Sequence, residues 1–122
     1  MAKILVVEDD FLVRLTLVEA LSDEGFHVIE AESGDAALPI LQADQSIKLL
    51  LTDIQLPGLL NGHALASKAR ENDPGLPIIY MTGRPGNDDE ADGSGRDVFI
   101  SKPYTLASVC QTARRLTTAP VE

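Results

Sequence analysis

The sequence predicts an α/β fold in which helices cover both faces of a five-stranded parallel sheet. Five short apolar segments alternate along the chain with segments of helical character, which is the pattern of strands joined by helical crossovers. Two of the apolar runs, Ile4–Val7 and Leu49–Leu51, are uninterrupted, as in strands that are buried on both faces. With 122 residues, 44% of them hydrophobic, the chain is expected to form one domain over residues 1–122.

The first third of the chain predicts a strand, a helix and a second strand. Ile4–Val7 is the first strand. A helix is expected from Phe11 to Glu24, because Asp10 can cap its start and Gly25 can end it. The segment Phe26–Ala31 is predicted to be a short strand near a sheet edge, since it mixes polar with apolar residues. The helix has four apolar residues on one face: Phe11, Leu15, Val18 and Leu21.

The middle of the chain repeats this alternation. Ser33 can cap a second helix, which is expected to end near Ala43. The run Leu49–Asp53 is predicted to be a central strand that stops at a carboxylate. A third helix is expected over Gly62–Asn72, and Pro77–Met81 is predicted to be a fourth buried strand.

The last third predicts one more strand and one more helix. Asp97–Ser101 is the fifth strand, and Thr105 can cap the final helix. Between strands four and five, Arg84–Arg96 is rich in Gly, Asp and Ser and has no amphipathic face. A helix between these two strands is therefore expected to be short, missing or disordered. The buried face of the final helix is expected to contain Leu106, Val109, Cys110, Ala113 and Leu116.

Polar side chains stand where four of the five predicted strands finish. They are Glu8, Asp9 and Asp10 after the first strand, Asp53 at the end of the third, Thr82 after the fourth and Lys102 after the fifth. The carboxyl ends of parallel strands meet at one edge of the sheet, where open α/β sheets bind their ligands. Taken alone, Asp53 could be a residue that caps a turn. Together with the other strand ends, it is predicted to be the centre of a functional site.

This combination of side chains predicts a site for a cation and a phosphoryl group. Clustered carboxylates repel one another, so either a carboxyl pKa rises or a cation binds. Carboxylate oxygens are ligands that suit Mg²⁺. Lys102 and the hydroxyl of Thr82 suit an anion with several oxygens. We therefore expect Mg²⁺ and a phosphoryl group beside Asp53, whose carboxylate can act as a phosphoryl acceptor.

Charge and cysteine content exclude several classes of function. The formal net charge is −9, which argues against nonspecific binding to nucleic acid or to an anionic membrane. Cys110 is the only cysteine and cannot form an internal disulfide. No run approaches the length of a membrane-spanning helix, and the N-terminal residues do not resemble a signal peptide. The cytoplasm is the expected compartment.

These residues make the chain resemble the receiver domain of two-component response regulators. The resemblance covers essentially the whole chain. It rests on Glu8-Asp9 after Ile4–Val7, on Asp53 after its buried strand, and on Leu56-Pro57-Gly58, Thr82-Gly83 and Lys102-Pro103. It implies a flavodoxin-like, doubly wound sheet with the strand order 2-1-3-4-5.

The resemblance implies a role for each residue of the acidic part of the site. Asp53 corresponds to the phosphoacceptor and Asp9 to the direct Mg²⁺ ligand, with Glu8 acting through a water molecule. Asp53 and the backbone carbonyl of Gln55 would complete the ligands from the protein. The pair Asp9-Asp10 is an alternative register for the acidic pair. The end of the apolar run at Val7 favours Glu8-Asp9, with Asp10 as the helix cap.

The resemblance also implies roles for three residues near the last two strands. Lys102 corresponds to the lysine that pairs with the phosphate, and its bond to Pro103 would be cis. Thr82 corresponds to the switch hydroxyl that moves toward the phosphate, and Phe99 to the aromatic residue that moves with it.

Two segments depart from the usual receiver pattern. The loop over Leu56–Gly62 is one residue longer than the commonest form, and the segment Thr82–Lys102 is shorter. The family's usual signalling and dimer face includes the helix expected in the second segment. We therefore expect that face to work differently here, and Asn87–Gly95 to be mobile or to order only on phosphorylation or partner binding.

The function implied is that of a phosphoacceptor in a two-component or phosphorelay system. A histidine kinase or a histidine phosphotransfer protein would supply the phosphoryl group to Asp53, which would switch a surface that binds a partner. The domain would catalyse only its own phosphorylation and dephosphorylation, so it would not be a turnover enzyme. It would be a monomer or weak dimer, and either a single-domain regulator or part of a larger protein such as a hybrid kinase. The alternative is an interaction module on the same fold that is not phosphorylated.

Overall fold

The five predicted strands form one parallel sheet. In the computed structural model, which describes residues 2–83 and 96–118, the strand order is β2-β1-β3-β4-β5 and every pairing is parallel. The order implied by the resemblance is therefore confirmed, as is the place of β2 at an edge. The strands are β1 (Lys3–Val7), β2 (His27–Ala31), β3 (Ile47–Asp53), β4 (Ile78–Thr82) and β5 (Asp97–Ser101).

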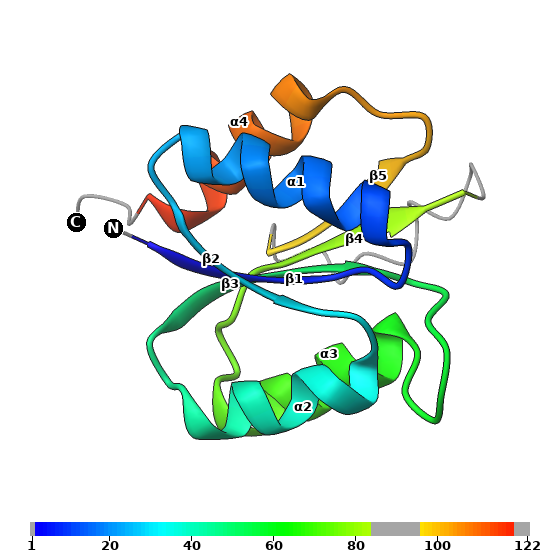
Figure 1. Cartoon of the computed structure of the whole chain (residues 1–122). Coiled ribbons are helices and arrows are strands. Elements are labelled where there is room, and N and C mark those ends of the chain that lie inside the picture. Colours follow the sequence, from blue (N-terminus) through cyan, green and yellow to red (C-terminus); the bar gives the residue numbers. More distant parts are fainter. Residues whose placement is uncertain (1, 84–95, 119–122) are drawn as a thin grey trace.

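Four helices in the described residues cover the two faces of this sheet. α1 (Phe11–Asp23) and α4 (Leu106–Thr117) lie on one face, and α2 (Gly34–Ala43) and α3 (Gly62–Asn72) lie on the other (Figure 1). The N-caps of α1, α2 and α4 are the predicted residues Asp10, Ser33 and Thr105. Each of the three accepts a hydrogen bond from a backbone N–H of the first helical turn, which satisfies a donor that the helix itself leaves unpaired.

The sheet separates two layers of hydrophobic core. Neighbouring residues of a strand point to opposite faces, so the apolar runs of the central strands supply both layers. Leu5 and Leu50 belong to the layer under α2 and α3, whereas Ile4 and Leu51 belong to the layer under α1 and α4. This double burial fixes β1, β3 and β4 in the centre of the sheet and holds their carboxyl ends at one edge.

The burial of two helix faces departs from the spacing of their apolar residues. The predicted apolar face of α1 is only partly the buried one, because Phe11 is 61% exposed while Leu17 and Leu21 are completely buried. Apolar residues surround α1, so their spacing alone did not identify the side that packs on the sheet. The expectation that Leu106 lies on the buried face of α4 was wrong, because this first residue of the helix is 39% exposed. The other expected core positions of α4 are buried or partly buried.

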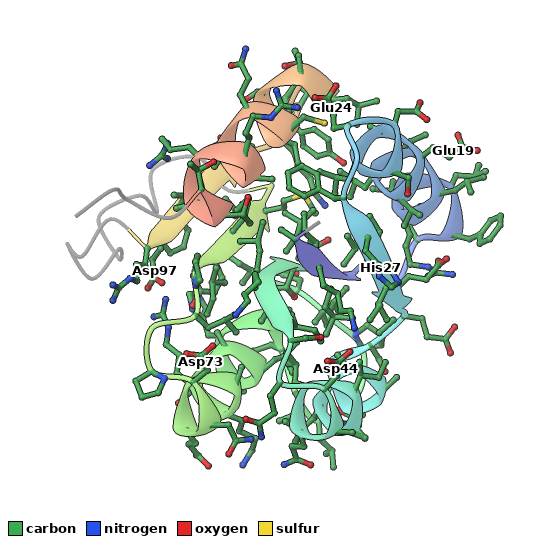
Figure 2. All side chains as sticks on the ribbon, turned by 90° about the vertical axis from the view of Figure 1, so that its left-hand side faces the viewer. Glu19, Glu24, His27, Asp44, Asp73 and Asp97 are labelled. Atoms are coloured by element: carbon green, nitrogen blue, oxygen red, sulfur yellow. The ribbon has the colours of Figure 1, made fainter. Side chains whose placement is uncertain are left out.

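At the amino ends of the strands, several acidic side chains have basic partners. Figure 2 views this end of the molecule and labels Glu24, Asp44 and Asp97. Lys3 Nζ lies 2.8 Å from Asp44 Oδ2, and this hydrogen bond holds the pKa of Asp44 well below its usual value. Ion pairs also join Arg70 to Asp97 and Arg114 to Glu24.

The expectations for the segment between β4 and β5 lie outside the described residues. They concern residues 84–95, and include both the short or missing helix and the mobility of Asn87–Gly95. None of the helices within residues 2–83 and 96–118 has the length and apolar character that crossing a bilayer requires.

Candidate functional site

The turn after β1 places two carboxylates at the carboxyl edge of the sheet. The backbone N–H of Glu8 donates to the carbonyl of Ala31 at the end of β2, at 3.1 Å. Asp10 then begins α1, and its Oδ1 accepts hydrogen bonds from two backbone N–H groups of the first helical turn. Asp10 is therefore engaged as a helix cap, as expected, and Glu8 and Asp9 are the acidic pair that remains at the strand end.

Asp53 occupies the end of the central strand, between β1 and β4. It is the last residue of β3 and is only 7% exposed. The backbone just beyond it is fixed, because the N–H of Ile54 donates to the carbonyl of Met81 and the N–H of Gly62 donates to the carbonyl of Ile54. A Cβ atom at Gly62 would lie 2.3 Å from the carbonyl oxygen of Asp53. α3 can therefore begin against the strand end only because residue 62 is glycine.

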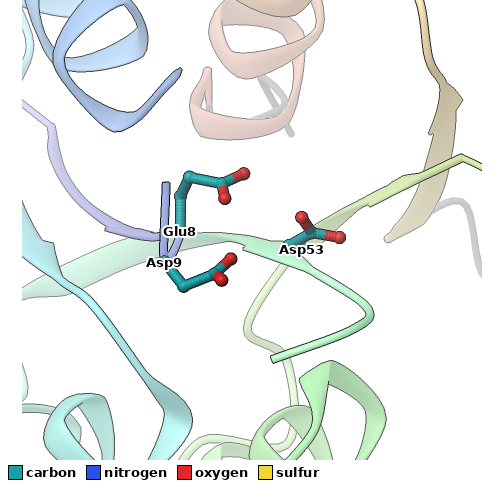
Figure 3. A group of neighbouring side chains, drawn as sticks. All are labelled: Glu8, Asp9 and Asp53. Atoms are coloured by element: carbon teal, nitrogen blue, oxygen red, sulfur yellow. The ribbon is translucent and has the colours of Figure 1, made fainter. Parts of the chain in front are cut away.

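The three carboxylates form a compact acidic group. One oxygen from each of Glu8, Asp9 and Asp53 can be chosen so that all three lie within 4.8 Å of one another. Figure 3 shows the carboxylates of Glu8 and Asp9 extending toward the end of β3, where Asp53 lies. Glu8 and Asp53 are buried, whereas Asp9 is exposed. The group is therefore accessible from solvent on the side of Asp9.

Glu8 lies in an environment that disfavours its charged form. Burial of the carboxyl group, with the nearby charge of Asp53, raises the pKa of Glu8 to about 7. Within the described part of the chain, its buried Oε1 has no hydrogen-bond partner. A buried carboxylate oxygen without a donor is costly, so it favours either a proton or a bound cation. The donor set and this orphaned oxygen fit a hard divalent cation such as Mg²⁺.

Lys102 brings a positive charge to the same place from the end of β5. Its Nζ donates a hydrogen bond to Asp53 Oδ2 at 2.9 Å and lies 4.0 Å from Glu8 Oε1. Burial acts to lower the pKa of Lys102, but the hydrogen bond and charge of Asp53 outweigh it and raise the pKa. The backbone N–H of Lys102 donates to the carbonyl of Thr82 at 2.7 Å, and the bond from Lys102 to Pro103 is cis.

An open hollow lies beside Asp53 on the side of β4. It has a volume of about 310 Å³ and is lined by Asp53, Gln55, Thr82, Gly83 and Lys102. Gln55 is exposed, and its backbone N–H lies 3.4 Å from Asp53 Oδ1. The structure thus brings the predicted acidic, hydroxyl and ammonium groups together around one carboxylate, with space for a small anion.

Phe99 does not line this hollow but belongs to a set of aromatic rings beside it. Its ring stacks on that of Tyr80, with centroids 4.7 Å apart and an interplanar angle of 18°. The ring of His63, at the start of α3, lies 4.9 Å from Tyr80 on the same side of the sheet. Nothing in its sequence neighbourhood predicts the contact, because the three rings come from three separate elements.

The long loop between β3 and α3 is tied to α2 by Asp35. The two carboxylate oxygens of Asp35 accept hydrogen bonds from the backbone N–H groups of Leu59 and Leu60, at 3.3 and 3.0 Å. Gly58 has a φ of +89°, a conformation that L side chains rarely adopt, and it lies against the same carboxylate. Asp35 was not identified from the sequence, where it is simply an acidic residue in the first turn of a helix.

Comparison with known proteins shows one family. A model of the response regulator receiver domain matches residues 4–114. The response regulator receiver protein CpdR of Brucella abortus is 35% identical over 122 residues, which cover 95% of this chain and 97% of CpdR. The aerobic respiration control protein ArcA of Escherichia coli is 36% identical over 93% of this chain. The chain spans 47% of the length of ArcA.

A solved structure extends the similarity to the arrangement of the elements. The response regulator TrrA of Thermotoga maritima, in complex with Mg²⁺-BeF, matches with a TM-score of 0.83 and 27% sequence identity. The match covers 95% of this chain and 99% of that one.

Proposed function

Because this chain belongs to the family of response regulator receiver domains, we propose that it is a phosphoacceptor in a two-component or phosphorelay system. A histidine kinase or a histidine phosphotransfer protein supplies a phosphoryl group to Asp53. One observation carries the proposal: the Asp53 carboxylate lies between an acidic pair and the Lys102 ammonium, at the edge of an open hollow.

We assign the cation site to the acidic group. Asp9, Asp53 and the backbone carbonyl of Gln55 would hold Mg²⁺, and Glu8 would act through a water molecule. The orphaned oxygen of Glu8 supports a cation there, as does the Mg²⁺ bound by the related TrrA. When bound, the ion supplies positive charge that offsets the repulsion among the carboxylates and the phosphoryl oxygens.

The reaction is a transfer of the phosphoryl group from nitrogen to oxygen. A carboxylate oxygen of Asp53 attacks the phosphorus of the phosphohistidine, a P–O bond forms and the P–N bond breaks. The electron pair of that bond leaves with the imidazole of the donor. Lys102, which already donates to Asp53 at 2.9 Å, stabilises the negative charge that gathers on the phosphoryl oxygens. The domain then hydrolyses its own aspartyl phosphate slowly, and does not turn over a separate substrate.

The signal is carried by residues of β4 and β5. Thr82 lines the hollow, so its hydroxyl can donate to a phosphoryl oxygen on Asp53. The backbone link from Lys102 to Thr82 joins the two strand ends. We propose that phosphorylation shifts Thr82 and Phe99 between two arrangements and so changes a surface that binds a partner. The cytoplasm is the proposed compartment.

A phosphotransfer experiment tests the proposal. Histidine phosphotransfer domains labelled with radioactive phosphate are mixed with the chain, with its Asp53→Ala variant and with an Asp23→Ala control, which changes an exposed aspartate at the far end of α1. We expect label to pass to the wild type and to the control but not to Asp53→Ala. If no donor passes label to a folded wild-type chain, an interaction module that is not phosphorylated becomes the better account.

A further inference from the structure

Arg14 connects the acidic turn to the edge strand of the sheet. It lies in the second turn of α1, and its side chain is only 13% exposed. Its Nη1 donates to the backbone carbonyl of Glu8 at 2.8 Å, and its Nε donates to Glu30 Oε1 at 2.8 Å. One planar guanidinium therefore spans the carboxyl ends of β1 and β2.

The carbonyl that Arg14 holds belongs to the peptide group that joins Glu8 to Asp9. The opposite side of Glu8 is held as well, because its N–H donates to the carbonyl of Ala31. These two bonds fix the orientation of the backbone from which both acidic side chains depart. Asp9 is exposed and cannot rely on surrounding packing for its position. The bond from Arg14 holds the peptide group before Asp9, and the bond from the Asp10 N–H to Glu8 Oε2, at 3.0 Å, holds the peptide group after it.

Glu30 in turn fixes the guanidinium. It lies next to Ala31 in β2, so the residue that orients Arg14 and the residue that holds the Glu8 N–H are neighbours on one strand. Arginine suits this position because its donors are held in a rigid fork, so that Nε and Nη1 can serve two acceptors at once. Lysine has the same charge but only a single ammonium on a flexible chain.

We propose that Arg14 is a positioning residue for the acidic pair, and that it sets the affinity of Glu8 and Asp9 for a divalent cation. This inference rests on the proposed function. Arg14 acts through the backbone, because its hydrogen bonds go to a main-chain carbonyl and to Glu30 and not to the carboxylates of the site. Groups that orient metal ligands without touching the metal typically change affinity by about 10-fold or more when they are removed.

Replacing Arg14 should change the affinity for a divalent cation in opposite directions, depending on whether Arg14 acts by positioning the acidic pair or only through its charge. A positive charge near the site repels a divalent cation, so its removal would raise the affinity if charge were its only contribution. Loss of the hydrogen bond to Glu8 would lower the affinity, because the acidic pair would no longer be held in place. Arg14→Lys distinguishes the positioning effect from the charge effect, because it keeps the positive charge but loses the paired donors of the guanidinium.

The experiment measures Mg²⁺ binding by calorimetry with the wild type, Arg14→Lys, Arg14→Met and Lys48→Met. Lys48 is an exposed residue near the amino end of β3, so Lys48→Met removes the same charge far from the site. We expect both Arg14 variants to bind Mg²⁺ about 10-fold more weakly and Lys48→Met to bind as the wild type does. A second readout needs no metal: amide hydrogen exchange at Glu8 and Asp10, whose N–H groups donate to the Ala31 carbonyl and to Glu8 Oε2, should be faster in both Arg14 variants.

The measured Mg²⁺ affinities decide whether Arg14 is a positioning residue. An Arg14→Lys protein that binds Mg²⁺ within threefold of the wild type, or an Arg14→Met protein that binds it more tightly, would overturn it. If Arg14→Met fails to fold, Arg14→Lys alone gives the decision. A folded wild-type chain that binds no Mg²⁺ would instead contradict the proposed function. In that case the exchange rates without metal would still show whether Arg14 holds the turn that carries Glu8 and Asp9. Unchanged rates in both Arg14 variants would show that it does not.

Discussion

Lys102 donates a hydrogen bond to Asp53 across the end of a strand that lies between them. The two atoms, Lys102 Nζ and Asp53 Oδ2, are 2.9 Å apart, although β4 separates β5 from β3 in the sheet. The same ammonium lies 4.0 Å from Glu8 Oε1. One positive charge therefore faces two of the three carboxylates of the acidic group, and its removal should change both cation binding and phosphoryl uptake.

Lys102→Met should slow phosphorylation and strengthen Mg²⁺ binding. The rate should fall because the phosphoryl oxygens lose a charged donor, an effect on the order of 100-fold for one such group in a preorganised site. Mg²⁺ should bind more tightly because a neighbouring cation is gone. The initial rate with acetyl phosphate at saturating Mg²⁺ measures the first effect, and calorimetry measures the second. Lys48→Met is the charge control, and a Lys102→Met rate equal to that of the control would contradict the role of Lys102.

The stability of the metal-free protein should fall as the pH rises from about 4.5 to about 7. The pKa of Glu8 is raised from 4.5 to about 7 by burial and by Asp53, so the folded chain keeps a proton there that the unfolded chain releases. Over that interval the folded state binds more protons, and the free energy of unfolding decreases with pH before it levels off above 7.

Urea unfolding at several pH values, with a chelator present, measures this dependence. Glu8→Gln should remove it, because the amide does not titrate and the two states then bind protons equally at this position. Added Mg²⁺ should stabilise the wild type most at the upper end of the range, where Glu8 is ionised. Equal pH dependence in the wild type and in Glu8→Gln would show that Glu8 is not the titrating group.

Gly62→Ala should destabilise the protein and disturb Asp53. The added methyl group would lie 2.3 Å from the Asp53 carbonyl oxygen and 2.8 Å from Ile54 Cα, so the start of α3 must shift away from the strand end. Forced shifts of this kind typically cost about 2 kcal/mol. Gly75→Ala is the matched control, because its nearest neighbouring atom lies at 3.8 Å. Gly62→Ala should unfold at a lower temperature and be phosphorylated more slowly than Gly75→Ala. Similar unfolding temperatures and rates for the two variants would refute the close contact at Gly62.

Asp35→Ala should loosen the loop that follows Asp53. The N–H groups of Leu59 and Leu60 would lose their acceptors, so their amide hydrogens should exchange much faster with solvent. Asp35→Asn retains one carbonyl oxygen and should keep part of the protection. The sheet should exchange as in the wild type, because Asp35 is exposed and its carboxylate bonds to the loop. Unchanged protection at Leu60 in Asp35→Ala would exclude the tie between α2 and this loop.

Much of the fold was predictable because its signals are local. Apolar runs predict the central strands, and side chains such as Asp10 and Ser33 cap the helices that follow them. The placement of Asp53 and Lys102 followed from one rule, that parallel strands bring their carboxyl ends to the same edge. The strand order came from the resemblance, since local signals do not contain it.

The features that the sequence did not predict depend on contacts between distant elements. The buried face of α1 was not identified, because apolar residues surround that helix and only the packed sheet distinguishes Leu17 from Leu15. Arg14 meets Glu30 only after β1 and β2 have paired. The ring contact between His63 and Tyr80 likewise requires α3 to lie against β4. These partners have no fixed separation along the chain, so the sequence alone does not indicate that they meet.

Asp53 is proposed to accept a phosphoryl group with the help of a divalent cation. The most direct test is the intact mass of the wild type and of Asp53→Ala after incubation with acetyl phosphate or with a histidine-phosphorylated donor domain, with Mg²⁺ or with a chelator. The wild type with Mg²⁺ should gain the mass of one phosphoryl group, whereas the wild type with the chelator and Asp53→Ala should gain none. Phosphorylation of folded Asp53→Ala to the wild-type level, or no phosphorylation of the wild type by either donor, would contradict this role of Asp53.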